Sequence, residues 1–241
     1  PRLISIYHNF KRQTIAGRPD VFVGVDAPDF NLRLEEQLKK SGIPTVQFVS
    51  PSIWAWRYQR IEQIRRAVDH MLVLFPFEVE LYEKEEIQVT YVGHPLAQQI
   101  PAEPDARAAR LRLGLDPDKP VLAILPGSRK SEINALSKVF LETAQKLHQK
   151  YPDLQFIVPL VNEARKQQFM EISKGIELAN LHLYSQAVSE QPISRDVMEA
   201  CDAALLASGT ASLEMALYKK PMVIAYILSP LMVKIMAWKS G

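Results

Sequence analysis

The chain has 241 residues, a formal net charge of +2, and 47% hydrophobic and 23% charged residues. These are ordinary values for a globular protein, and the length suits one large domain or two modest ones. The near-neutral charge argues against a nucleic-acid-binding protein. The single cysteine, Cys201, excludes a disulfide framework and a cysteine-cluster metal site, so we expect it in the core.

Short Val/Ile/Leu-rich runs alternate with segments of helical period, a pattern that predicts an α/β fold with parallel sheets. We expect nine strands, at 20–25, 44–49, 69–74, 89–92, 120–125, 154–158, 180–184, 202–207 and 221–226. The clearest helices are 29–40, which Gly42 closes, and 131–149. The chain begins inside one helical pattern and ends in another, at 232–238, so we expect it to be a piece of a longer protein. Its apolar runs are of strand length, and no transmembrane span is expected.

Four prolines and a charged run with little core pattern lie within 95–118, the best position for a domain boundary. We therefore expect a Rossmann-like domain over 1–98, a linker over 99–118 and a second Rossmann-like domain over 119–241. Two halves joined in this way are expected to enclose a cleft.

The first candidate site follows the strand at 120–125. Gly127 and Ser128 form a tight turn, Arg129 follows, and a helix begins. The free N–H groups of a first helical turn and the helix dipole attract an anion, and Arg129 can grip phosphate with two parallel hydrogen bonds. This is neither a Walker loop nor a dinucleotide fingerprint, so it favours a nucleotide-sugar or phosphate site. Glu132 is equally well placed to cap the turn.

The second candidate site repeats this arrangement. The strand at 202–207 runs into Ser208, Gly209 and Thr210, and Glu214 lies early in the next helix. In a parallel sheet both turns open on the same edge. We expect one turn and Arg129 to hold phosphates and Glu214 to hold ribose hydroxyls. The alternative for Glu214 is an ordinary acid on the helix surface.

The N-terminal half carries less specific candidates. Trp54, Trp56, Arg57 and Arg60 lie in or just after a loop, which suits membrane contact, substrate contact or core packing. His94 lies between a glycine and a proline, where a structural histidine is the default and substrate contact the alternative.

Six segments together resemble the lipid-A-disaccharide synthases, a family of bacterial glycosyltransferases. They are 21–31 (VFVGVDAPDFN), 49–57 (VSPSIWAWR), 74–78 (LFPFE), 92–95 (VGHP), 125–133 (LPGSRKSEI) and 207–214 (ASGTASLE). The family's N-terminal glycine-rich segment and its C-terminal helices have no counterpart here.

The resemblance implies a GT-B fold that transfers 2,3-diacylglucosamine, with inversion, from UDP-2,3-diacylglucosamine to the 6-hydroxyl of 2,3-diacylglucosamine 1-phosphate. It implies no metal or cofactor, a homodimer in the complete protein, and a place on the inner face of the inner membrane of a Gram-negative bacterium. Inverting transfer needs a base, which the resemblance assigns to Asp26, with Arg129 also at the reaction centre. Asp26 and Asp29 can each instead cap the following helix, and Asp29 is the better cap. Another UDP-sugar enzyme, such as a 2-epimerase, and a non-catalytic fragment that binds UDP-sugar or lipid are the alternatives.

Overall fold

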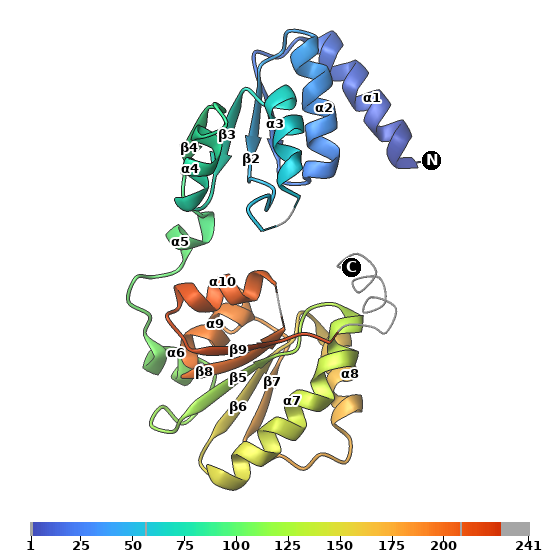
Figure 1. The fold of residues 1–241 in the computed structure, drawn as a ribbon. Helices are drawn as coiled ribbons and strands as arrows, with labels where there is room; N and C mark the ends of the chain where they lie inside the picture. The colour runs from blue at the N-terminus through green and yellow to red at the C-terminus, as the bar shows by residue number, and fades with distance from the viewer. Residues whose placement is uncertain (1, 56, 208, 228–241) are drawn as a thin grey trace, which may run out of the picture. The chain divides into compact units, whose positions relative to one another are not determined.

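The computed structural model describes residues 2–55, 57–207 and 209–227. The chain divides into two compact units, one up to Ala97 and one from Gln98 onward. Each unit contains a parallel sheet flanked by helices (Figure 1).

The sheet of unit 1 has the order β1-β2-β3-β4 and is parallel throughout. Its strands are β1 (Phe22–Val25), β2 (Thr45–Phe48), β3 (His70–Val73) and β4 (Val89–Tyr91). The helices are α1 (Arg2–Gly17), α2 (Pro28–Lys40), η1 (Tyr58–Arg60), α3 (Ile61–Ala67), α4 (Phe77–Glu83) and α5 (Pro95–Gln99), which crosses the boundary. Buried apolar side chains of α2, α3 and α4 pack against β3: Leu32, Ile64 and Tyr82 of the helices lie in one cluster with Met71 and Val73 of the strand.

The sheet of unit 2 has the order β7-β6-β5-β8-β9 and is also parallel. Its strands are β5 (Val121–Leu125), β6 (Gln155–Pro159), β7 (Leu181–Tyr184), β8 (Ala203–Ala207) and β9 (Met222–Ala225). The helices are α6 (Ala106–Arg112), α7 (Lys130–Lys150), α8 (Glu163–Ser173), α9 (Ile193–Ala200) and α10 (Thr210–Leu217). In Figure 1, α7 and α8 lie on one face of the sheet, and α6, α9 and α10 on the other. The strand order reverses between β5 and β8, the point where ligands bind in doubly wound sheets.

All nine expected strands are present, within one or two residues of their predicted ends. The helix expected at 131–149 is α7, whose apolar face packs on β5 and β6 through Ile133, Leu136, Phe140 and Ala144. Cys201 is fully buried, and burial raises the pKa of its thiol to about 12. The helix expected at 232–238 lies outside the described residues.

The structure differs from the expectation over 99–118. This segment belongs to unit 2 and contains α6, which packs against α9 and buries Ala109. Arg110 and Arg112 of α6 are used in ion pairs with Asp202, and with Asp196 and Glu199. The charged run that was expected to lie in a linker therefore forms ion pairs that hold α6 against the rest of unit 2.

Candidate functional site

Unit 2 contains a cavity of about 650 Å³ at the carboxyl ends of β5, β6 and β8. Both candidate turns line it. Its lining includes Gly127, Ser128, Arg129, Gly209, Thr210 and Glu214. The structure thus brings together six of the seven residues expected around UDP; the seventh, Ser208, lies outside the described residues.

The turn after β5 is shaped by Gly127, whose φ of 108° is open to glycine and rarely to other residues. The backbone N–H groups of Ser128 and Arg129 converge on one anion. That anion is the carboxylate of Glu132: its Oε2 accepts from Ser128 N at 3.0 Å and from Arg129 N at 3.1 Å. Arg129 Nη1 donates to Glu132 Oε1 at 2.9 Å. The capping role considered for Glu132 is therefore confirmed.

Burial raises the pKa of Glu132, but the two backbone donors and Arg129 outweigh burial and bring it below its ordinary value. Glu132 is thus held as an anion at the helix N-terminus, where the dipole also favours negative charge. The Arg129 side chain remains 80% exposed, so one face of the guanidinium is open to a further anion.

The turn after β8 is shaped in the same way by Gly209, which has a φ of 141° and is the N-cap residue of α10. Glu214 lies on the second turn of α10 and is half-buried at the cavity wall.

The wall on the β7 side comes from the loop at 185–192. Ser189 and Gln191 of this loop donate to the buried carboxylate of Asp196, at 2.7 and 2.9 Å. Arg112 donates to the same carboxylate, so α6 helps to hold the cavity rim.

In unit 1, Asp26 follows the last residue of β1 and its side chain is exposed. Its φ of 51° and the φ of 41° at Ala27 turn the chain sharply between β1 and α2. Hydrogen bonds hold both the N–H and the carbonyl of the Asp26 backbone. Its N–H donates to Phe48 O at 2.9 Å, and its carbonyl accepts from Asn31 Nδ2 at 2.8 Å and Gln47 Nε2 at 3.0 Å.

The expectation that Asp29 caps α2 is wrong. The N-cap residue is Ala27, and no side chain caps this helix end. Asp29 lies inside the first turn and forms an ion pair with Arg60, one of the residues expected to contact substrate or membrane. Asp26 does not cap the helix either, which leaves its carboxylate available for chemistry.

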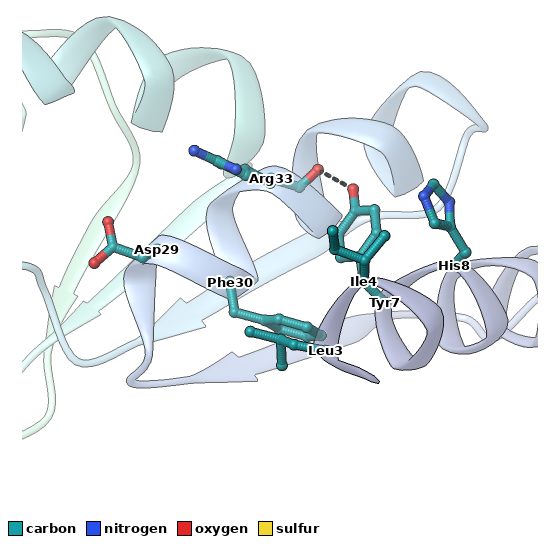
Figure 2. Close-up of a pocket in the computed structure, with 7 residues that line it drawn as sticks. All are labelled: Leu3, Ile4, Tyr7, His8, Asp29, Phe30 and Arg33. Carbon is teal, nitrogen blue, oxygen red and sulfur yellow. Dashed lines mark hydrogen bonds between the residues drawn. The ribbon is translucent and has the colours of Figure 1, made fainter. Parts of the chain in front are cut away.

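An apolar cavity of about 400 Å³ lies beside Asp29, between α1 and α2. Figure 2 shows Leu3, Ile4 and Tyr7 of α1 beside Phe30 and Arg33 of α2. The Tyr7 hydroxyl donates to the Arg33 carbonyl at 3.0 Å and fixes one wall. Leu3 and Ile4 are 66% and 63% exposed, so the cavity opens onto an apolar surface of α1.

A row of aromatic rings runs along the carboxyl edge of β2 and β3. Trp54 is 54% exposed and packs edge-on against Phe77, with ring centroids 5.3 Å apart. Phe75 stacks on Phe77 and also lies 6.2 Å from His94. The His94 Nδ1 accepts from Leu96 N at 3.1 Å, the local role expected of a structural histidine. Arg57 is exposed with a φ of 61°, and Trp56 lies outside the described residues.

Three polar residues around Asp26 were not predicted as site residues: Asn31, Gln47 and Glu35. Gln47 and Glu35 are fully buried. A signal was present, because Gln47 interrupts an apolar strand and Glu35 lies three residues from both Leu32 and Leu38, on the buried side of α2. Their partners, however, come from other elements and are not visible in the sequence.

No cluster of three or more His, Cys, Asp or Glu side chains suited to a metal ion occurs among the described residues. None of the helices described is long and apolar enough to cross a membrane.

Two Rossmann-like units with parallel sheets, and a cavity at the strand ends of the second, define an α/β protein of the GT-B type, so the predicted fold class is confirmed. Solved structures agree. UDP-GlcNAc 2-epimerase from Neisseria meningitidis is 14% identical with a TM-score of 0.59, over 96% of this chain and 66% of that one. E. coli ADP-heptose lps heptosyltransferase II is 14% identical with a TM-score of 0.50, over 94% and 69%. At these identities the likeness concerns the fold alone.

The chain belongs to the lipid-A-disaccharide synthetase family, whose model matches residues 1–237. It is 59% identical to the lipid-A-disaccharide synthase of Bordetella pertussis over 243 residues, which cover 100% of this chain and 62% of that protein. It is 49% identical to the enzyme of that name from Chromobacterium violaceum, over 96% and 59%. The chain thus spans about three fifths of the length of these curated relatives.

Proposed function

We propose that the complete protein is a lipid-A-disaccharide synthase, and that this chain supplies its UDP site and part of its acceptor site. The enzyme transfers 2,3-diacylglucosamine from its UDP conjugate to the 6-hydroxyl of 2,3-diacylglucosamine 1-phosphate, with inversion. The products are the β-1,6 disaccharide and UDP. Family membership supports the reaction, and the single structural observation that carries it is the cavity shared by Gly127–Arg129, Gly209–Thr210 and Glu214.

In this cavity the N–H groups of both turns bind the diphosphate, Arg129 pairs with it, and Glu214 accepts from the ribose hydroxyls. Ser208, which precedes Gly209 in the sequence, is included in the proposal. The diphosphate takes the Ser128 and Arg129 N–H groups that Glu132 now holds. Binding of UDP therefore includes a movement of Glu132 away from the turn. The same donors then stabilise the negative charge that develops on UDP as it leaves.

Asp26 is the general base. Its carboxylate removes the proton of the acceptor 6-hydroxyl while that oxygen bonds to C1 of the donor sugar. The bond from C1 to the diphosphate oxygen breaks, and its electron pair leaves with UDP. Two features support this assignment: Asp26 lies at the carboxyl end of a strand, and its carboxylate is exposed without serving as a helix cap.

The acyl chains of both substrates place the enzyme on the inner face of the inner membrane. The exposed apolar cavity between α1 and α2 suits an acyl chain, and Trp54, Trp56, Arg57, Arg60 and His94 are the candidates for contact with the acceptor or the lipid surface. Indole rings favour the membrane interface, and arginines near anionic lipid add attraction. We also propose that the complete protein is a homodimer.

Mass spectrometry of the products tests the reaction. With both substrates present, the full-length protein should form disaccharide and UDP in equal amounts. A 2-epimerase, the alternative within the same fold, would change its UDP-sugar without an acceptor. A non-catalytic binding protein would bind UDP and form neither product.

A further inference from the structure

Glu35 and Gln47 form a buried polar pair beneath the strand ends that carry Asp26. Both side chains are fully buried. Neither carboxyl oxygen of Glu35 has a hydrogen-bond partner among the described residues, and the same holds for Gln47 Oε1. Buried polar atoms are rarely left unpaired, so three such oxygens in adjacent side chains need an explanation.

The Gln47 amide nitrogen settles the orientation of this side chain. Nε2 donates to three backbone carbonyls, those of Asp26 at 3.0 Å and of Phe48 and Val49 at 3.2 Å each. Rotating the amide by 180° would place its oxygen against those three acceptors, so Oε1 must point the other way.

Gly24 shows where Oε1 points. A Cβ at this position would overlap Glu35 Oε1 and lie 2.6 Å from Gln47 Oε1, so both oxygens face the same point under β1. Two acceptor oxygens that converge on one buried point repel each other unless one carries a proton. Only a carboxylic acid can supply it, because an amide oxygen is always an acceptor.

We propose that Glu35, as a neutral carboxylic acid, is a positioning residue for Asp26: its O–H donates to Gln47 Oε1 and holds the Gln47 amide against the Asp26 carbonyl. The inference rests on the proposed function, in which Asp26 is the general base.

Two observations agree with this role. Burial raises the pKa of Glu35 to about 8, so the neutral acid predominates at neutral pH. Asp26 also needs support, because its φ of 51° lies in the left-handed region, which favours glycine over other residues. The Gln47 and Asn31 side chains both bond its carbonyl and keep that conformation.

Kinetics of the full-length protein test the proposal. Glu35→Leu removes the donor, and we expect kcat to fall by about 10- to 100-fold because the base is misplaced, with UDP affinity unchanged. Glu35→Gln should keep nearly normal kcat, because its amide N–H can donate to Gln47 Oε1. Leu34→Ala is the control for lost stability, since Leu34 is buried in the same helix; it should lower the melting temperature and leave kcat of the folded enzyme unchanged.

Infrared spectroscopy gives a second readout that does not depend on activity. The difference spectrum between wild type and Glu35→Gln at pH 7 should contain the C=O band of a protonated carboxylic acid. A carboxylate signal in its place, normal kcat in Glu35→Leu, or equal loss in Glu35→Gln and Glu35→Leu would each overturn the proposal. If Asp26→Asn kept normal turnover while Glu35→Leu lost it, the base assignment would fail and Glu35 would still act on the turn.

Discussion

Glu132 holds, within its own turn, the two backbone donors that the proposed function assigns to the diphosphate of UDP. A carboxylate and a phosphate are both anions with oxygen acceptors, so one set of donors serves either. Arg129 is 80% exposed. In the proposed complex it pairs with the UDP diphosphate after Glu132 has moved away from the turn.

Arg129→Ala should therefore weaken UDP binding by about 1.5–3 kcal/mol, the range for a hydrogen bond to a charged group. Isothermal titration calorimetry of the full-length protein measures this directly. Lys130→Ala is the matched control, because Lys130 is the next residue, is exposed and does not line the cavity. Equal UDP affinity in wild type and Arg129→Ala would remove Arg129 from the site.

Glu132→Gln should show a pH-dependent loss of stability. The folded state lowers the pKa of Glu132, so its stabilising effect is complete above the ordinary carboxyl pKa of about 4.3 and is lost as the pH falls through the lower folded value. Denaturant unfolding at several pH values should show a constant difference between wild type and variant near neutrality, which shrinks below about pH 4. Glu142→Gln, an exposed acid later in α7, is the control. A difference that grows on acidification would contradict the capping geometry.

At the scale of elements, strands and glycine turns were predictable from the sequence because their signals are local. Apolar runs located all nine strands, and small residues at strand ends located the turns at Gly127 and Gly209. Helix α6 was not predicted, because it buries a single alanine and is held by ion pairs to residues some 90 positions away.

The cap of α2 shows the same limit. Asp29 is a favourable capping residue by type, but Arg60 engages it across 31 positions, and the chain turns instead through Ala27 in the left-handed region. The buried pair of Glu35 and Gln47 likewise depends on three elements meeting at Gly24. Residues of the candidate sites that act through local backbone were predictable, and those that act through tertiary contacts were not.

For the whole molecule, the proposed reaction has acylated substrates, and from it we expect contact with a lipid surface. The full-length protein should co-sediment with anionic vesicles, less so at high salt because screening weakens the arginine contribution. Trp54→Ala should lower the bound fraction without unfolding the protein, because Trp54 is more than half exposed. Tyr151→Ala, which removes an aromatic ring 49% exposed in unit 2, is the control. If only the control lowered binding, the membrane contact would lie elsewhere.

We propose that UDP binds at unit 2 and that the carboxylate of Asp26, in unit 1, is the general base. Asp26→Asn in the full-length protein tests it most directly, with turnover and UDP affinity measured on one preparation. We expect kcat to fall by about 100- to 10,000-fold, the usual contribution of a general base, while UDP affinity stays within a factor of about two. Near-normal turnover would show that Asp26 is not the base, and a loss of UDP affinity as large as that of Arg129→Ala would show that Asp26 contributes to the UDP site.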